Sequence, residues 1–229
     1  MKKSELDFSG SWKHISVKGN SPTPTIQESR GSPVSSTAPQ LRIYLFRHAQ
    51  TYFNKRHIFT GWKDSRLTPF GREQARKIAA KLRNKKIDVA FQTSLSRSRD
   101  TLRAVLKYHP ECRRKFTDDR MIERSYGKLM GMSHDVYKKT HTPEELHRIR
   151  RSYDYPPPGG ESIRMVEKRV LPFLKDLISY MKKYRVNVAI SAHGNSMRPF
   201  RRYFEKLSIK QMMSLENPWD GYFEYKIKV

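Results

Sequence analysis

Cysteine is nearly absent from this sequence, with Cys112 the single one among 229 residues. The chain can therefore form no internal disulfide and no cluster of thiolate metal ligands. Long apolar runs are missing too, since no stretch approaches the ~20 apolar residues that a membrane span requires. The start, MKKSELDFSGSW, lacks the apolar segment of a secretory signal and carries Glu5 and Asp7, which a transit peptide would avoid. These absences predict a cytoplasmic protein with no membrane partner.

Acidic residues are scarce relative to basic ones. The chain has 22 Asp and Glu against 47 Lys and Arg, a formal net charge of +25 at pH 7. Such a charge favours anionic partners, which include phosphorylated metabolites, nucleic acids and anionic lipids. The basic residues are spread along the chain and no nucleic-acid-binding motif is present, so nucleic acid is not the expected partner.

The first 40 residues differ in composition from the rest. They are rich in Ser, Thr, Pro and Gly and contain few large apolar side chains, so they cannot bury enough surface to offset their chain entropy. We expect residues 1–40 to be a disordered Ser/Pro-rich tail and residues 41–229 to be one folded domain. The tail carries five basic and three acidic residues, so most of the positive charge belongs to the domain.

Within the domain, short β-prone runs alternate with amphipathic segments. Thr68 followed by Pro69 predicts one helix start, and the capping box of Thr142 and Glu145 predicts another. The alternation predicts an α/β fold, a three-layer α/β/α sandwich with a mostly parallel central sheet. We expect strands at 41–46, 87–94, 186–193 and 222–229, and helices at 69–84, 95–108, 142–151, 161–184, 195–206 and 208–215.

Polar residues follow three of the predicted strands. LFRHAQT places Arg47 and His48 at the end of the first, AISAHGNS places His193 at the end of another, and Arg97 follows the second strand by one turn. In parallel sheets, ligands bind beyond the carboxyl ends of the strands, where a helix N-terminus also offers free N–H groups to an anion. We therefore expect the two histidines and two arginines to meet in one pocket.

Such a set of side chains suits a phosphoryl group. Arginine binds phosphate through two parallel hydrogen bonds and keeps its charge at any physiological pH. A neutral imidazole is a competent nucleophile, and a second histidine would help to stabilise the charge that spreads over the oxygens. A carboxylic acid would still be needed to protonate the leaving oxygen. A lone strand-end histidine is more often structural, and arginines on a helix are usually solvated. Only the recurrence of these residues at strand ends favours a chemical role.

The motifs RHAQT, TSLSRSRDT, ERSYG and SAHGNSMR, in that order, resemble those of the histidine phosphatase superfamily. Within it, the chain is most similar to the cofactor-dependent phosphoglycerate mutases. NKRHIFTGWKDSRLTPFGREQA resembles the stretch after their catalytic histidine, and IRRSYDYPPP resembles their paired-arginine, proline-rich substrate segment. The likeness covers about residues 41–225 and implies a phosphoglycerate mutase-like catalytic domain.

The resemblance implies a role for each matching residue. His48 would be the nucleophile that carries the phosphoryl group, and Glu123 would be the general acid and base. For Tyr126 the alternative is that it only fills the core, and without the resemblance the arginine pair would as readily be surface charge. Arg47, Asn54, Arg97 and His193 would surround the phosphoryl group, and the substrate site would include Thr60, Gly61, Tyr126, Arg150, Arg151 and Asn195.

The chain departs from the mutase pattern at several places. Ala49 replaces the usual glycine and would add a methyl group close to the phosphate site, and His134 stands where mutases carry a substrate-binding lysine. TSLSRSR is one residue shorter than the common spacing, so the alignment favours Arg97 over Arg99. The insertion that usually precedes GGES is missing, and we expect no C-terminal tail to close the site. A more open site would favour hydrolysis.

The resemblance implies a phosphoglycerate mutase that interconverts 3-phosphoglycerate and 2-phosphoglycerate in glycolysis and gluconeogenesis. It would work through a phosphohistidine primed by 2,3-bisphosphoglycerate, without a metal. The alternative is a phosphomonoesterase that acts on another small phosphorylated metabolite, and a further alternative is a non-catalytic polyanion-binding protein. A homo-oligomer is compatible with the family, which contains monomers, dimers and tetramers.

Overall fold

A central sheet organises the chain. The structure, a computed structural model, describes residues 13–16 and 40–229. Its strands lie in the order β1-β4-β3-β5-β2-β6. The four inner strands are parallel, whereas β1 and β6 pair antiparallel at the two edges, which confirms the predicted mostly parallel sheet. The strands are β1 (Lys13–Ser16), β2 (Gln40–Arg47), β3 (Val89–Gln92), β4 (Arg114–Thr117), β5 (Val188–Ala192) and β6 (Phe223–Lys228).

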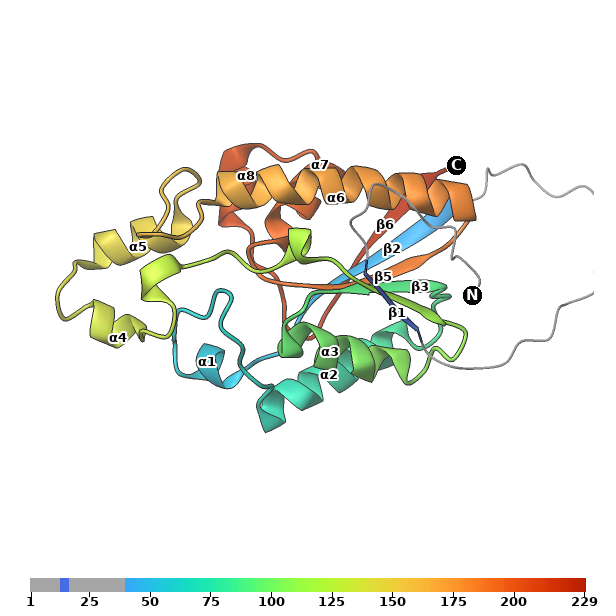
Figure 1. Cartoon of the computed structure of the whole chain (residues 1–229), viewed down its shortest axis with the longest axis horizontal. Coiled ribbons are helices and arrows are strands. Elements are labelled where there is room, and N and C mark those ends of the chain that lie inside the picture. Colours follow the sequence, from blue (N-terminus) through green and yellow to red (C-terminus); the bar gives the residue numbers. More distant parts are fainter. Residues whose placement is uncertain (1–12, 17–39) are drawn as a thin grey trace, which may run out of the picture.

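Helices cover both faces of the sheet, as Figure 1 shows, and give the predicted three layers. α2 (Pro69–Leu82) and α3 (Ser96–Leu106) pack on one face. α6 (Ile163–Tyr184) and α7 (Met197–Glu205) pack on the other, with α8 (Ile209–Ser214) beside α7. The short elements α1 (Tyr52–Lys55), α4 (His134–Tyr137) and α5 (Pro143–Arg151) gather at one end, and the 3-10 helices are η1 (Asp119–Met121) and η2 (Gly127–Leu129).

Side chains that alternate between the two faces of the inner strands form two separate hydrophobic cores. In β2, Ile43 and Leu45 belong to the cluster under α6 and α7, whereas Tyr44 and Phe46 belong to the cluster under α2 and α3. Successive side chains of a strand point to opposite faces, so a strand buried on both sides must be apolar throughout. The uninterrupted apolar run LRIYLF therefore fits an inner strand.

Local signals in the sequence predicted several elements correctly. The Thr68 hydroxyl accepts a hydrogen bond from the Gly71 N–H at the start of α2, and the capping box of Thr142 and Glu145 opens α5. The second predicted strand is shorter than 87–94, since only Val89–Gln92 pair, and α6 begins two residues later than expected, at Ile163.

Two strands were not predicted at all. β1 lies inside the stretch expected to be a disordered tail, and it pairs with β4, which is equally unpredicted. Residues 13–16 are therefore a correction to that prediction. The rest of the predicted tail, apart from Gln40 at the start of β2, falls on residues 1–12 and 17–39, which lie outside the described residues, so its disorder stays a prediction.

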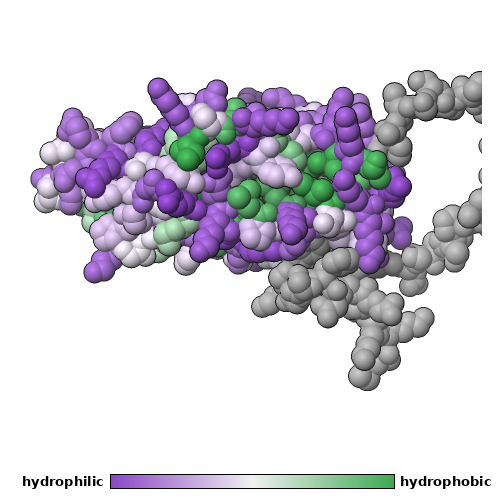
Figure 2. Space-filling model, turned by 90° about the horizontal axis from the view of Figure 1, so that it is seen from above, coloured by the Kyte–Doolittle hydropathy of each residue, from purple (hydrophilic) through white to green (hydrophobic). Residues whose placement is uncertain are grey.

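The surface is mostly hydrophilic, as Figure 2 shows from the side that α6 covers. Apolar side chains interrupt the hydrophilic surface on that side. Met165 and Leu171 of α6 are exposed. Over residues 13–16 and 40–229, no helix combines the length and the apolar character needed to span a bilayer.

Gly71 lets α2 approach the loop that follows β2. A Cβ atom at this position would lie 2.0 Å from the Gln50 carbonyl oxygen. We expect Gly71→Ala to lower the free energy of unfolding by about 1–3 kcal/mol, as overpacking typically does. Denaturant unfolding measures the change. Gly221→Ala is the control, because its nearest neighbour would be a Pro218 ring carbon at 3.3 Å. Equal stability of the two variants would contradict the expectation.

Candidate active site

Two neighbouring parallel strands bring the histidines together. β2 pairs with β5 so that Arg47 lies opposite Ala192. The pairing continues for one more residue, since the His48 N–H donates to the Ala192 carbonyl at 2.9 Å. His193 follows directly on β5, and the two imidazole rings lie 5.0 Å apart between centroids. This geometry confirms the expectation that both histidines lie together beyond the carboxyl ends of the strands.

The environment of His48 keeps its imidazole neutral. The side chain is 2% exposed, and its Nδ1 lies 2.8 Å from the Ala49 carbonyl oxygen. Because a carbonyl only accepts, Nδ1 carries the proton and the lone pair is on Nε2. Burial, followed by the charges of Arg97 and Arg47, lowers the pKa of His48 well below its usual value. A neutral Nε2 is the form that can attack phosphorus.

Two buried arginines flank the histidines. Arg97 is completely buried, and its Nη1 and Nη2 donate to the carbonyl oxygens of Lys63 and Gly61 at 2.9 and 2.6 Å. Burial lowers the pKa of Arg97 to about 10, so it remains charged at neutral pH. Arg47 donates to the Asn217 carbonyl at 3.4 Å. Gly194 leaves room for Arg47, since a Cβ there would lie 3.2 Å from the Arg47 Cζ.

Glu123 presents its carboxyl group to the histidines. It lies on the loop between η1 and η2, and its Oε1 accepts N–H bonds from Arg124 at 2.8 Å and Asn195 at 3.1 Å. One carboxylate oxygen and one ring nitrogen each of His48 and His193 lie within 4.8 Å of one another. That separation puts an acid within reach of an oxygen bonded to a phosphorus atom at His48.

The same three ligand atoms raise the question of a metal ion. Their spacing resembles what a small metal site requires. However, burial and then the charges of Arg97 and Arg47 lower the pKa of both histidines, and that positive charge equally opposes a bound cation. The set of groups fits an anion better than a metal ion.

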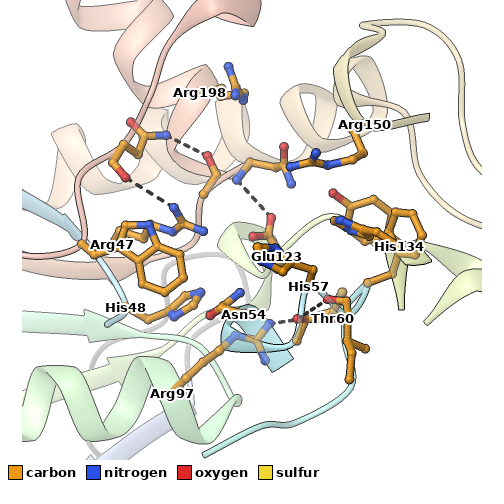
Figure 3. A pocket seen from close by; sticks show the side chains of 18 of the residues that line it. Arg47, His48, Asn54, His57, Thr60, Arg97, Glu123, His134, Arg150 and Arg198 are labelled. Atoms are coloured by element: carbon orange, nitrogen blue, oxygen red, sulfur yellow. Dashed lines mark hydrogen bonds between the residues drawn. The ribbon is translucent and has the colours of Figure 1, made fainter. Parts of the chain in front are cut away.

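A cavity of about 320 Å³ lies beside His48, Glu123 and the two arginines. Figure 3 shows His48, Arg47 and Arg97 on one side of it and Arg150 and His134 on the other, with Glu123 between. Five arginines and two glutamates line it. Its volume is at the lower end of the range for small-molecule sites, and its charge suits a compact anion.

Three further arginines, Arg150, Arg151 and Arg198, line the cavity. Arg198 donates from Nη1 to the carbonyl oxygens of Met212 and Met213, and burial lowers its pKa to about 10. Arg151 forms an ion pair with Glu216 at 2.8 Å. His134, by contrast, has its pKa lowered to about 4 by burial and then by Arg150, so it adds no charge at neutral pH.

A segment near the C-terminus closes one side of the cavity. We call residues 215–222 the strap; they run from the end of α8 to β6. The strap is anchored, because the Asn217 amide donates to the Gly194 carbonyl at 2.8 Å and Arg201 donates to the Glu216 carbonyl at 3.0 Å. Glu216, Asn217 and Trp219 of the strap line the cavity. The sequence had led us to expect an open site, so this wall is a finding of the structure.

The structure brings the predicted site residues together. Eleven of the twelve line the cavity, and His193 lies beside His48 with no exposed surface. Arg97, not the exposed Arg99, belongs to the cavity, as the alignment favoured. The roles of these residues stay predictions. Sequence reasoning assigned no role to several lining residues, namely His57, Ile58, Phe59, Gly194, Arg198, Glu216, Asn217 and Trp219.

Ala49 does not crowd the cavity as we had expected. Its methyl group is fully buried in a small apolar cluster with Leu67 and Ala75, and Ala49 is not among the lining residues. The substitution of the usual glycine therefore fills space beside α2 and α3 rather than space at the phosphate site. Its N–H donates to the Thr101 hydroxyl at 3.0 Å, which fixes the backbone next to His48.

A three-layer fold whose strand ends hold a neutral histidine among arginines, with a carboxyl group in reach, is that of an enzyme that handles phosphoryl groups. Residues 43–220 match the histidine phosphatase superfamily (branch 1), and the chain belongs to that superfamily. The resemblance found in the motifs is thereby confirmed.

Curated relatives carry a more particular name. A 2,3-bisphosphoglycerate-dependent phosphoglycerate mutase of Parvibaculum lavamentivorans is 39% identical over 177 residues, which cover 76% of this chain and 84% of that relative. A protein of the same name from Chelativorans sp. is 35% identical over 178 residues, or 76% and 86% of the two chains.

Similar solved structures bear other names. A mycobacterial glucosyl-3-phosphoglycerate phosphatase matches with a TM-score of 0.70 and 22% identity, over 81% of this chain and 89% of that one. An alpha-ribazole phosphatase from Shigella flexneri matches with a TM-score of 0.71 and 18% identity, over 82% and 95%. At these identities the likeness shows the fold alone.

The two buried histidines, His48 and His193, make stability depend on pH, and the half-buried His134, with its pKa lowered to about 4, adds to the same trend. Each is neutral in the folded chain, whereas an unfolded histidine has a pKa near 6.5. As the pH falls below about 6.5, the unfolded chain takes up protons that the folded chain does not, so stability is lost. We expect a loss of about 1 kcal/mol per histidine between pH 6.5 and 5.5.

Denaturant unfolding at the two pH values measures this loss. His193→Gln should remove one histidine's share and flatten the dependence, whereas His147→Gln, on the exposed side of α5, should leave it as in the wild type. An unchanged slope in His193→Gln would show that His193 takes up its proton in the folded chain as it does in the unfolded chain, and would contradict the expectation.

Proposed function

We propose that this chain is a 2,3-bisphosphoglycerate-dependent phosphoglycerate mutase, which interconverts 3-phosphoglycerate and 2-phosphoglycerate. The observation that carries the proposal is that arginines lie at two opposite sides of one small cavity. Arg47 and Arg97 stand at the nucleophile, and Arg150 stands at the opposite side. A substrate with a phosphate at one end and a carboxylate at the other matches that charge distribution, and the names of the curated relatives agree with it.

The donor atoms of the cavity fit the bisphosphorylated cofactor. The buried Nε atoms of Arg47, Arg97 and Arg198 have no hydrogen-bond partner among the described residues. Buried donors of this kind are normally satisfied, and anionic oxygens satisfy guanidinium groups best. When bound, 2,3-bisphosphoglycerate would supply the phosphoryl group that primes His48.

In the proposed mechanism, primed His48 carries the phosphoryl group on Nε2 while Arg47 and Arg97 hold its oxygens. The free hydroxyl oxygen of a bound monophosphoglycerate attacks this phosphorus, the P–N bond breaks, and Glu123 takes the hydroxyl proton. The substrate, now phosphorylated on both hydroxyl oxygens, turns in the cavity. The Nε2 lone pair of His48 then attacks the other phosphorus, and Glu123 returns the proton to the alkoxide oxygen that leaves. His48 ends phosphorylated, as it began. The reaction would take place in the cytoplasm, in glycolysis and gluconeogenesis.

A phosphomonoesterase is the second candidate, and His134 favours it. Where the resemblance calls for a lysine, this imidazole adds no charge at neutral pH, because its pKa lies at about 4. Arg151 is also partly engaged by Glu216. A substrate with a neutral polar group at the far end, which would give its phosphate to water, would fit that side as well.

A coupled assay tests the proposal. Purified protein receives 3-phosphoglycerate with and without 2,3-bisphosphoglycerate, and both 2-phosphoglycerate and free phosphate are followed. We expect isomerisation that depends on 2,3-bisphosphoglycerate, with little phosphate released, and no isomerisation by His48→Asn. Phosphate release without isomerisation would establish the phosphomonoesterase instead.

The leaving group reveals the role of Glu123. Removing a general acid typically lowers the rate by ~10²–10⁴-fold. We expect Glu123→Gln to lose this much with a phosphoglycerate, whose alkoxide must be protonated. With p-nitrophenyl phosphate the first transfer to His48 should be far less affected, because nitrophenolate leaves without a proton. A pre-steady-state burst of nitrophenolate measures that step, and an equal loss with both substrates would contradict the role.

A further inference from the structure

Trp219 has a position that the proposed mechanism does not use. Its ring lies over the guanidinium group of Arg47, 4.1 Å from the Arg47 Cζ to the ring centroid. The same ring meets the His48 imidazole nearly edge to face, with centroids 6.2 Å apart. An indole lining the cavity therefore borders both the nucleophile and the arginine beside it.

The strap holds this indole in place. Asn217, two residues before it, is buried, donates to the Gly194 carbonyl and accepts from Arg47 through its own carbonyl. A cation stacked on tryptophan adds about 0.5–2 kcal/mol, more where water is excluded. The ring is therefore a fixed apolar surface beside His48 and Arg47 rather than a mobile side chain on the protein surface.

The phosphoryl group on His48 has two acceptors to choose between. With an alcohol, the hydroxyl oxygen bonds to phosphorus, the P–N bond breaks, the electron pair returns to Nε2 and the hydroxyl proton passes to Glu123. With water, the same bonds form and break, and the same carboxylate takes the proton. Because the chemistry is identical, the choice depends on which acceptor can reach the phosphorus atom.

We propose that Trp219 is a specificity-determining residue, which excludes water from the phosphoryl group on His48 and so favours transfer to an alcohol over hydrolysis. The proposal rests on the proposed function only in that a phosphohistidine forms at His48. The apolar ring lines the cavity from the strap, whose two other lining residues, Asn217 and Glu216, are polar.

Phosphoenzyme lifetime tests the proposal. The protein is labelled with ³²P from 2,3-bisphosphoglycerate and freed of excess donor, and its loss of label is followed in buffer alone and with 3-phosphoglycerate. We expect Trp219→Ala to lose label to water about tenfold faster than the wild type. Transfer to 3-phosphoglycerate should change by less than about threefold, so the ratio of the two rates moves.

Further variants separate shielding from other effects. Trp219→Phe and Trp219→Leu keep an apolar side chain and should retain most of the wild-type lifetime, and Leu also lacks a ring to hold Arg47. Phe70→Ala, an exposed aromatic residue on α2 outside the cavity, is the matched control and should behave as the wild type. Thermal unfolding of each variant verifies that it is folded.

Each other outcome overturns the proposal in a recognisable way. Equal lifetimes in the wild type and Trp219→Ala would show that the ring excludes no water. An equal change of both transfer rates would show that Trp219 only positions Arg47. If the wild-type protein becomes labelled from neither 2,3-bisphosphoglycerate nor ³²P-labelled p-nitrophenyl phosphate, no phosphohistidine forms. In that case both the proposed function and the proposed role of Trp219 are wrong.

Discussion

The parallel pairing of β2 with β5 is the constraint on which the site depends. Its register sets Arg47 opposite Ala192, and His48 and His193 follow as the next residue of each strand. A shift of one residue would turn every side chain of β2 to the opposite face of the sheet and would exchange the two cores. The clusters that alternate along β2 therefore fix the register, and the register fixes the distance between the two imidazoles.

The Glu123 carboxyl group is positioned by contacts of its loop with α6 rather than by the sheet. Arg169, on α6, donates to the carbonyl oxygens of Ile122 and Glu123, at 2.8 and 3.1 Å, and forms an ion pair with Glu161. Glu161 in turn accepts the Ser125 N–H at 2.9 Å. The loop of Glu123 is thus held at the N-terminal end of α6. The short GGES connection lies against the end of this loop, since a Cβ at Gly127 would lie 2.4 Å from the Gly159 carbonyl carbon and 2.5 Å from the Gly160 nitrogen.

Local patterns predicted the parts of this molecule that local physics decides. Strand 41–46, the caps at Thr68 and Thr142 and the histidines at strand ends all follow from neighbours within a few residues. What the sequence alone did not predict depends on contacts between distant segments. β1 pairs with β4 across about a hundred residues, and Trp219 reaches Arg47 across about 170 residues of chain. The position of Arg97 one turn after a strand also predicted its place, whereas Glu123 was placed only through resemblance, because no spacing rule links a loop carboxylate to a strand-end histidine.

The far side of the cavity has a small core of its own. Five buried residues form it, namely Phe59, Leu129, Tyr137, Leu146 and Ile149, against twenty in the cluster under α6 and α7. Segments with little buried apolar surface open at a lower free energy than the rest of a domain. Arg150 directly follows Ile149 of this small core, while Arg47 belongs to the central sheet. An anion that bridges the two arginines would therefore couple ligand affinity to the local folding equilibrium of α4 and α5, and would slow amide hydrogen exchange there more than in the sheet.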